Sequence, residues 1–202
     1  MTDSRVELSA IPYPMHWDVA AASFEVRGDD AFTIGAPPRS DLFHAPDGSR
    51  SVENAPRLLF PVSVPCILSA RVSVDFQDTF DAGALLVRRN DRTWAKLCLE
   101  RVPDGRATVV SVVTHGRSDD CTSHVVESDG TWLRIALLEA SVAFHVSEDG
   151  ERWSLVRHFA LDPGLATRIG FSCQAPLGEG CHAHFDGVHY DAALLSEIRS
   201  GA

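Results

Sequence analysis

Hydrophobic and polar residues alternate one by one along much of this chain, which is the period of a β-strand. The clearest case is Asp81–Glu100, which reads DAGALLVRRNDRTWAKLCLE and predicts two strands joined by a polar turn. On the second strand one face carries Ala95, Leu97 and Leu99, and the other carries Trp94, Lys96, Cys98 and Glu100. The first face belongs to a core. The second face places an aromatic ring, a cation and a carboxylate in one row, which is the chemistry of a site for a polar ligand such as a sugar.

The rest of the chain shows the same pattern, with turns every 8–12 residues and no convincing long helix. We expect about a dozen strands in all, and this number is typical of a β-sandwich. Besides the two strands above, they are His16–Val19, Ser23–Arg27, Ala31–Ile34, Arg57–Val64, Cys66–Gln77, Ala107–Thr114, His124–Ser128, Thr131–Leu138, Ser141–Glu148, Trp153–Phe159, Ala166–Gln174 and Cys181–Tyr190.

Two stretches are expected to be loops. Arg39–Pro56 is rich in Asp, Pro, Gly, Ser and Asn, and a loop this long in a compact domain is often functional. His115–Asp120 is the second loop. We therefore expect a polar lead-in at 1–11, one sandwich domain at 12–190 and a short tail at 191–202, with at most one helical turn.

Composition narrows the classes of partner. The 202 residues are 45% hydrophobic, which is enough for a sizeable core, and the formal net charge is −10. That charge disfavours nucleic acid and an anionic membrane surface, because both are bound through Lys and Arg. The N-terminal residues do not resemble a signal peptide, and no segment is apolar enough to span a bilayer. Five cysteines without CxxC spacing favour a reduced, cytoplasmic protein. We expect no cofactor.

Five stretches in order carry a resemblance to a known family: GALLVRRNDRTWAKLCLE (Gly83–Glu100), SVVTHGRSDD (Ser111–Asp120), WLRI (Trp132–Ile135), FHVSEDGERW (Phe144–Trp153) and IGFSCQAPLGEGCHAHFDGV (Ile169–Val188). Together they resemble the family of unknown function that includes the yeast "regulation of enolase" protein, over about Pro12–Tyr190. The resemblance implies a concanavalin A-like lectin/glucanase sandwich, or jelly roll, in which two curved antiparallel sheets form a groove on the concave side. The chain departs from the family pattern at His44 and at Ser118–Cys121, where aromatic residues are usual.

The main hypothesis is that the concave groove binds a carbohydrate or polyol-like ligand without cleaving it. Trp94 would stack on a sugar ring, Lys96 and Glu100 would hydrogen-bond hydroxyls, and Arg88 would steady an acidic group. The long loop and neighbouring strands would complete the site with Asp41, Phe43, His44, Ser111 and Gln174.

Three other interpretations stay open. A glycosidase would need a second carboxylate opposite Glu100, and Asp41 or Asp75 could supply it, although no spacing pairs either with Glu100. A protein-interaction module would show a filled face at Trp94 and an apolar patch elsewhere, whereas a sugar site requires Trp94 and Glu100 to be partly exposed. His182 and His184 share a strand face, but no third ligand accompanies them, so we expect no metal.

Overall fold

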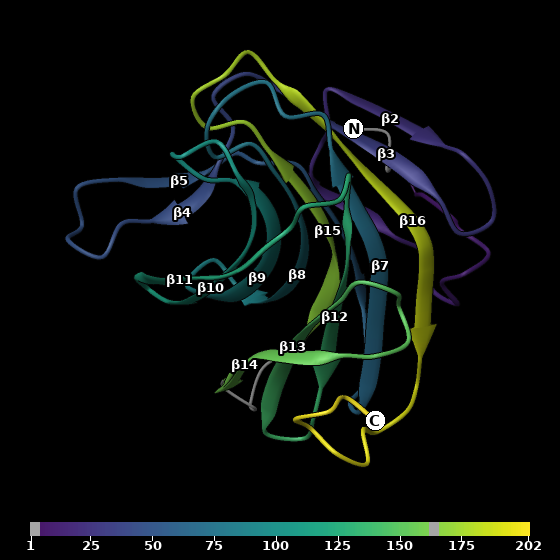
Figure 1. Ribbon diagram of the computed structural model, residues 1–202. Helices are drawn as coiled ribbons and strands as arrows, with labels where there is room; N and C mark the ends of the chain where they lie inside the picture. Colours follow the sequence, from purple (N-terminus) through teal and green to yellow (C-terminus); the bar gives the residue numbers. More distant parts are fainter. Residues whose placement is uncertain (1–4, 162–165) are drawn as a thin grey trace.

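The structure, a computed structural model, describes residues 5–161 and 166–202. Two seven-stranded antiparallel sheets pack face to face, which confirms the predicted β-sandwich (Figure 1). The first sheet runs in the order β1 (His16–Val19), β6 (Arg57–Pro61), β15 (Arg168–Gln174), β8 (Ala82–Asn90), β9 (Thr93–Arg101), β10 (Ala107–His115) and β11 (Ser118–Val125). The second runs β14 (Ser154–Ala160), β13 (Ser141–Ser147), β12 (Thr131–Leu137), β7 (Cys66–Val74), β16 (Cys181–Asp191), β3 (Phe32–Ala36) and β2 (Ser23–Val26).

The main core lies between the two sheets. Ala95, Leu97 and Leu99 of β9 are buried there, as their alternation predicted. Gly83 of β8 lies close to the second sheet, since a Cβ atom there would lie 2.8 Å from the side chains of both Val72 and Ala183. A contact of that length is tighter than van der Waals packing allows, so this position requires glycine.

A second, smaller core covers the opposite, concave face of the first sheet. It forms because residues 39–56, expected to be a loop, contain the hairpin of β4 (Leu42–His44) and β5 (Ser51–Glu53). Figure 1 shows this hairpin at the left, over the curved strands β8–β11. Leu42 and Ala55 pack there against Leu86 and Trp94.

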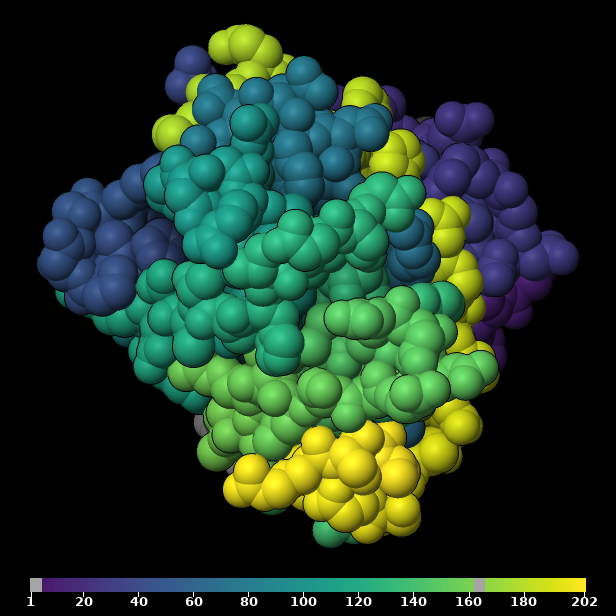
Figure 2. All heavy atoms as spheres, viewed as in Figure 1, coloured from purple at the N-terminus to yellow at the C-terminus, as the bar shows by residue number. Residues whose placement is uncertain are grey.

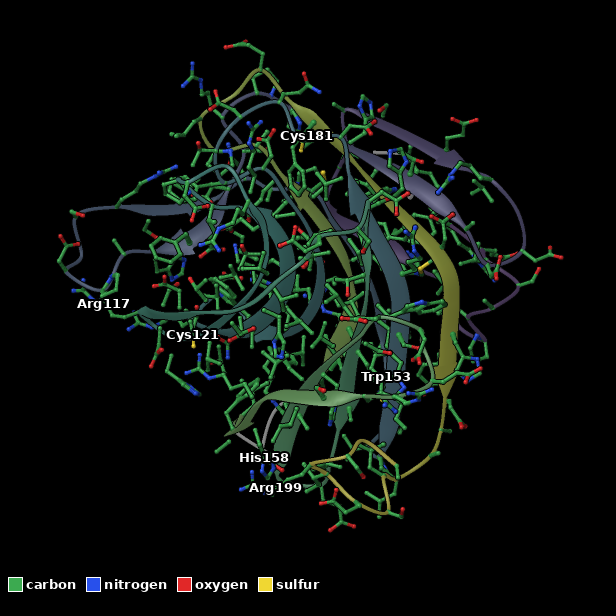
Figure 3. All side chains as sticks on the ribbon, viewed as in Figure 1. Arg117, Cys121, Trp153, His158, Cys181 and Arg199 are labelled. Atoms are coloured by element: carbon green, nitrogen blue, oxygen red, sulfur yellow. The ribbon has the colours of Figure 1, made fainter. Side chains whose placement is uncertain are left out.

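The tip of the hairpin is held by local and tertiary hydrogen bonds. Asp47 Oδ1 accepts from Ser49 N at 2.9 Å, and Gly48 adopts a φ of 79°, which closes the turn. Arg117, in the turn between β10 and β11, donates to the carbonyl oxygens of Ala45 and Pro46 at 3.3 and 3.2 Å (Figure 3). The hairpin is therefore anchored at its tip as well as at its apolar underside.

Strand β11 corrects the prediction of a loop at His115–Asp120 followed by a strand at His124–Ser128. It lies at the edge of its sheet, and every residue after Ser118 is exposed. A strand that is exposed to water on both faces need not alternate hydrophobic and polar residues, so the sequence pattern does not identify this strand.

Both ends of the chain pack on the sandwich. Leu8 and Ile11 in the lead-in are buried in the main core. Residues 192–202 form turns without a helical turn, and they cover β12 and β13, where Arg134 donates to Gly201 O at 2.9 Å and His145 bonds Ile198 O at 2.7 Å. Figure 2 shows this C-terminal segment in yellow against the green strands. Within 5–161 and 166–202, no helix has the length and apolar character needed to cross a membrane.

Candidate functional site

The concave face of β9 is divided into a covered end and an open end. At the covered end Trp94 is fully buried, and the ring of His44 lies edge-on to it with centroids 5.7 Å apart. The prediction that Trp94 stacks on a ligand is therefore wrong, because the β4–β5 hairpin occupies the position that a ligand would need. Its aromatic surface stabilises the hairpin instead. Of the two residues expected to be partly exposed in a sugar site, Glu100 is partly exposed and Trp94 is not, so any ligand must bind beyond Trp94.

Arg88, at the same covered end, is also a structural residue. Its side chain is 4% exposed and forms ion pairs with Asp18 at 3.4 Å, with Glu53 at 3.5 Å and with Asp91. The guanidinium is thus occupied by three carboxylates of the protein itself, and the prediction that it steadies an acidic ligand is wrong.

Ser111 faces away from the concave side. It is fully buried and follows the same alternation as Val109 and Val113, which lie in the main core, while Val110 and Val112 line the concave face. The expected ligand contact is therefore wrong. The register of β10 against β9, with Ser111 opposite Leu97, places the serine between the sheets.

At the open end, five of the nine predicted residues come together in a pocket of about 260 Å³: Asp41, Phe43, Lys96, Glu100 and Gln174. The alternation of β9 brings Lys96 and Glu100 to the floor, and Gln174 reaches it from the end of β15. The sequence reasoning missed the other lining residues, which are Arg50, Phe80, Val110, Val112, Asp120 and Pro176.

Lys96 is the only lysine in the sequence and is 2% exposed. Its Nζ donates to Leu42 O at 2.9 Å and to Gln174 Oε1 at 2.6 Å. Gln174 in turn donates through Nε2 to the carbonyl oxygen of Phe80 at 3.2 Å. This chain of hydrogen bonds links β4, β9, β15 and the turn before β8, so the polar floor of the pocket is fixed before any ligand arrives.

Phe80 is an aromatic residue at the pocket that no periodic pattern could identify. It lies in a turn, has a φ of 69° and leaves 36% of its surface exposed. A bulky residue in the left-handed region is a backbone outlier, and such strain is concentrated at functional sites. The turn is held by the Asp81 carboxylate, whose Oδ2 accepts from the backbone N–H groups of Gln77 and Asp78 at 2.8 Å each.

The carboxyl group of Glu100 has a strongly raised pKa. Burial raises its pKa from 4.5 to about 7, against the opposing effect of the Lys96 ammonium, and the carboxylates of Asp41 and Asp120 raise it further. Asp41 is held differently, since its Oδ1 accepts from Leu42 N at 2.8 Å and its Oδ2 lies 3.2 Å from Arg50. Near neutral pH the pocket therefore offers both a donor and an acceptor form of Glu100.

The comparisons with known proteins were consistent with the resemblance. Residues 17–193 match the family model "Protein of unknown function (DUF1349)". The chain belongs to this family. "Regulation of enolase protein 1" from Saccharomyces cerevisiae is 30% identical over 130 residues, which make up 55% of this chain and 65% of the yeast protein. The chain thus covers slightly less than two thirds of the length of that relative.

Solved structures support the sandwich fold. A functionally unknown protein from S. cerevisiae matches with a TM-score of 0.81 and 22% identity, over 88% of this chain and 96% of its own. A variant of the GH43 protein BlXynB from Bacillus licheniformis matches with a TM-score of 0.69 and 15% identity, over 89% of this chain but only 37% of its own. At these identities the likeness shows the fold alone.

The two departures from the DUF1349 pattern have different roles. His44 is buried, where its Nε2 lies 2.8 Å from Glu53 Oε1 and its backbone N–H donates to Ser118 Oγ at 3.0 Å. It is not one of the residues that line the pocket, and its side chain is occupied by Glu53, so the prediction that it binds ligand is wrong. In the Ser118–Cys121 segment, Asp120 lines the pocket, so the pocket has a carboxylate where the resemblance implied an aromatic residue.

The histidines on β16 take separate partners. His184 lies 2.9 Å from Thr33 Oγ1 and 3.1 Å from Asp75 Oδ2, while His182 lies 3.4 Å from Ser23 Oγ. No group of three metal-binding side chains occurs in the described ranges. Cys98 on the concave face is fully buried, and this burial raises its pKa to about 12, which leaves its thiol unreactive at neutral pH.

Proposed function

We propose that the protein binds a neutral sugar or a similar polyol in this pocket, as a single ring or as the end of a chain. The observation that carries the proposal is the arrangement of the lining. Fixed polar groups of Lys96, Glu100 and Gln174 form the floor, and the rings of Phe43 and Phe80 lie beside them. Sugars have hydroxyl edges and apolar C–H faces, so they are recognised by this combination of groups.

The covered end of β9 leaves room only for a single sugar ring or for the terminal ring of a polysaccharide. The β4–β5 hairpin fills the concave face above Trp94, so a polysaccharide cannot continue along the sheet in that direction. The volume of about 260 Å³ also lies below the roughly 300–1,000 Å³ of sites for drug-sized molecules. Both features favour one sugar ring over the middle of a polymer.

The charges of the pocket favour a neutral ligand. Asp41, Glu100 and Asp120 contribute carboxyl groups, whereas the cations are Lys96 and Arg50. Arg50 is paired with Asp41, and Lys96 already donates to two acceptors. A sugar acid would bring another carboxylate toward this acidic lining, and the like charges would weaken its binding.

The comparisons give this proposal limited support. A GH43 glycoside hydrolase shares the sandwich, although the part it shares is 41% of that chain. The name of the yeast relative, "Regulation of enolase protein 1", favours a second candidate function as a regulatory protein-binding module. The exposed edge strand β11 could pair with such a partner, because its outer backbone groups face water.

The test uses Lys96 as a reporter. Because the chain has one lysine, labelling with ¹⁵N-lysine gives a single backbone amide signal at the pocket floor. We would titrate the labelled protein with glucose, galactose, mannose, xylose, arabinose and N-acetylglucosamine, and with short linear oligomers of each. We expect the signal to shift in a saturable way with at least one of them.

A variant and its control locate the binding. Phe80→Gly removes the ring at a position whose backbone favours glycine, so it should weaken binding about tenfold while the protein stays folded. Val26→Ala removes an exposed apolar side chain from β2, remote from the pocket, and should leave binding unchanged. If the Lys96 signal moves with none of these sugars, or if Phe80→Gly binds as tightly as the parent, the proposal is wrong.

A further inference from the structure

Two thiols from different sheets meet near the pocket. Cys173 is next to last in β15, in the first sheet, and Cys181 begins β16, in the second. Their sulfur atoms lie 3.6 Å apart, and Cys181 Sγ also donates to Gln174 O at 3.1 Å. Figure 3 shows Cys181 in the upper part of the molecule, where β16 begins. No other pair of cysteines is in contact in the part of the chain that the structure describes.

We propose that Cys173 and Cys181 form a reversible disulfide that links the two sheets beside the pocket. A disulfide requires a sulfur–sulfur distance of about 2.05 Å, and the two sulfur atoms are already in van der Waals contact. Rotation of the two short side chains can therefore close the remaining gap with little movement of the strands. This inference does not rest on the proposed sugar binding.

An oxidant can approach Cys181 through a second cavity, which shares no lining residue with the pocket. Cys181 lines a surface cavity of about 600 Å³ together with Ser23, Asp75 and His182. There its thiol would reduce a peroxide, forming a sulfenic acid and releasing one water. The thiol of Cys173 then attacks that sulfur, which forms the disulfide and releases a second water.

Opening of the turn between the two cysteines should speed the reaction. The hydrogen bond with Cys173 and burial both raise the pKa of the Cys181 thiol, so the closed form reacts slowly. Residues 175–180 carry the exposed Leu177 and Glu179, and such surface turns open at low cost in free energy. Oxidation is thus expected over minutes to hours rather than seconds.

The cross-link would act on the pocket floor. Gln174 follows Cys173 directly and holds both Lys96 and the carbonyl of Phe80, and Pro176 in the bridged turn lines the pocket. Closing the bond at residue 173 therefore changes the environment of Lys96. It also closes a loop of nine residues in the unfolded chain, which should raise the Tm by about 5–10 °C.

The test treats the full chain with hydrogen peroxide or diamide, alkylates the remaining thiols and digests with trypsin. Cleavage after Arg168 and Arg199 gives a fragment whose only cysteines are Cys173 and Cys181. We expect this fragment to be lighter by two hydrogen atoms and to take no alkyl group until it is reduced. Cleavage at Glu179 should then give two pieces that stay joined.

Variants separate the cross-link from other oxidation. Cys121→Ser removes the exposed thiol, which could otherwise join two molecules, and should leave the cross-link intact. The ¹⁵N-Lys96 signal should move on oxidation of Cys121→Ser and of Cys66→Ala, but not of Cys181→Ser. The proposal is overturned if the 169–199 fragment still takes two alkyl groups after treatment with the oxidant. The effect of the disulfide on the pocket is overturned if the fragment cross-links but the chemical shift of the Lys96 signal does not change.

Discussion

The raised pKa of Glu100 predicts that this single carboxyl group shapes the pH dependence of stability. Its pKa is 4.5 in a solvated chain and about 7 in the folded protein, chiefly because burial disfavours the charged form. Folding therefore gains most from this group below about pH 4.5, where it is protonated in both states. The gain is lost as the pH rises toward about 7, since the folded protein must then either hold a buried charge or retain a proton.

The size of the effect follows from the two pKa values. A rise from 4.5 to about 7 corresponds to at most about 3.5 kcal/mol, at about 1.4 kcal/mol for each pKa unit. Glu100 is only half-buried, so water reduces the penalty, and we expect about 1–3 kcal/mol. Glu100→Gln keeps the shape of the side chain and removes the titration. Relative to the parent, it should thus become more stable by that amount between pH 4.5 and pH 8.

Urea unfolding at pH 4.5, 6, 7 and 8 would measure this difference. The control is Glu25→Gln, which removes an exposed carboxylate from a strand and should change stability little at any of these pH values. The reasoning is refuted if the free energies of unfolding of Glu100→Gln and of the parent differ by the same amount at pH 4.5 and at pH 8. It is also refuted if the parent becomes more stable relative to the variant as the pH rises.

Substitutions at three further positions test the assignments at the covered and open ends of the concave face. Trp94→Ala should lower the free energy of unfolding by about 3–5 kcal/mol in urea, because Trp94 fills a core, whereas Trp94→Phe should cost less. Arg88→Met should cost about 3 kcal/mol by the same assay, since Asp18 and Glu53 would lose their shared partner. Lys96→Met leaves Leu42 O and Gln174 Oε1 without their donor, so it should lower the free energy of unfolding by about 1–3 kcal/mol. It should also raise the pKa of Glu100 further, which a pH titration followed by NMR would measure.

The sandwich could be predicted because each inner strand faces two different environments. In β9 the apolar side chains alternate with Trp94, Lys96, Cys98 and Glu100, and the two faces lie as predicted. The same alternation placed Lys96 and Glu100 side by side in one pocket. Where the environments on the two faces are distinct, period two is sufficient to assign the faces.

Three errors arose where that condition fails. The run Ala107–Thr114 has valines on both faces, so its phase was ambiguous and Ser111 was assigned to the wrong side. The hairpin of β4 and β5 has strands of three residues, too short to show a period, so the cover over Trp94 was not foreseen. Phe80 lies in a turn whose geometry depends on Asp81 and Gln174, and hydrogen bonds of this kind leave no periodic signal.

The covered and open ends of β9 depend on one another through β4. The side chain of Leu42 packs in the small core with Trp94, while its carbonyl oxygen accepts from Lys96 at the pocket floor. The apolar contact that fixes the hairpin thus also fixes an acceptor of the pocket's buried cation. Because Lys96 in turn orients Gln174 and lowers the pKa of Glu100, burial of Trp94 bears on the chemistry of the pocket without contact with any ligand. The tryptophan that sequence reasoning placed in the site supports that site from beneath the hairpin.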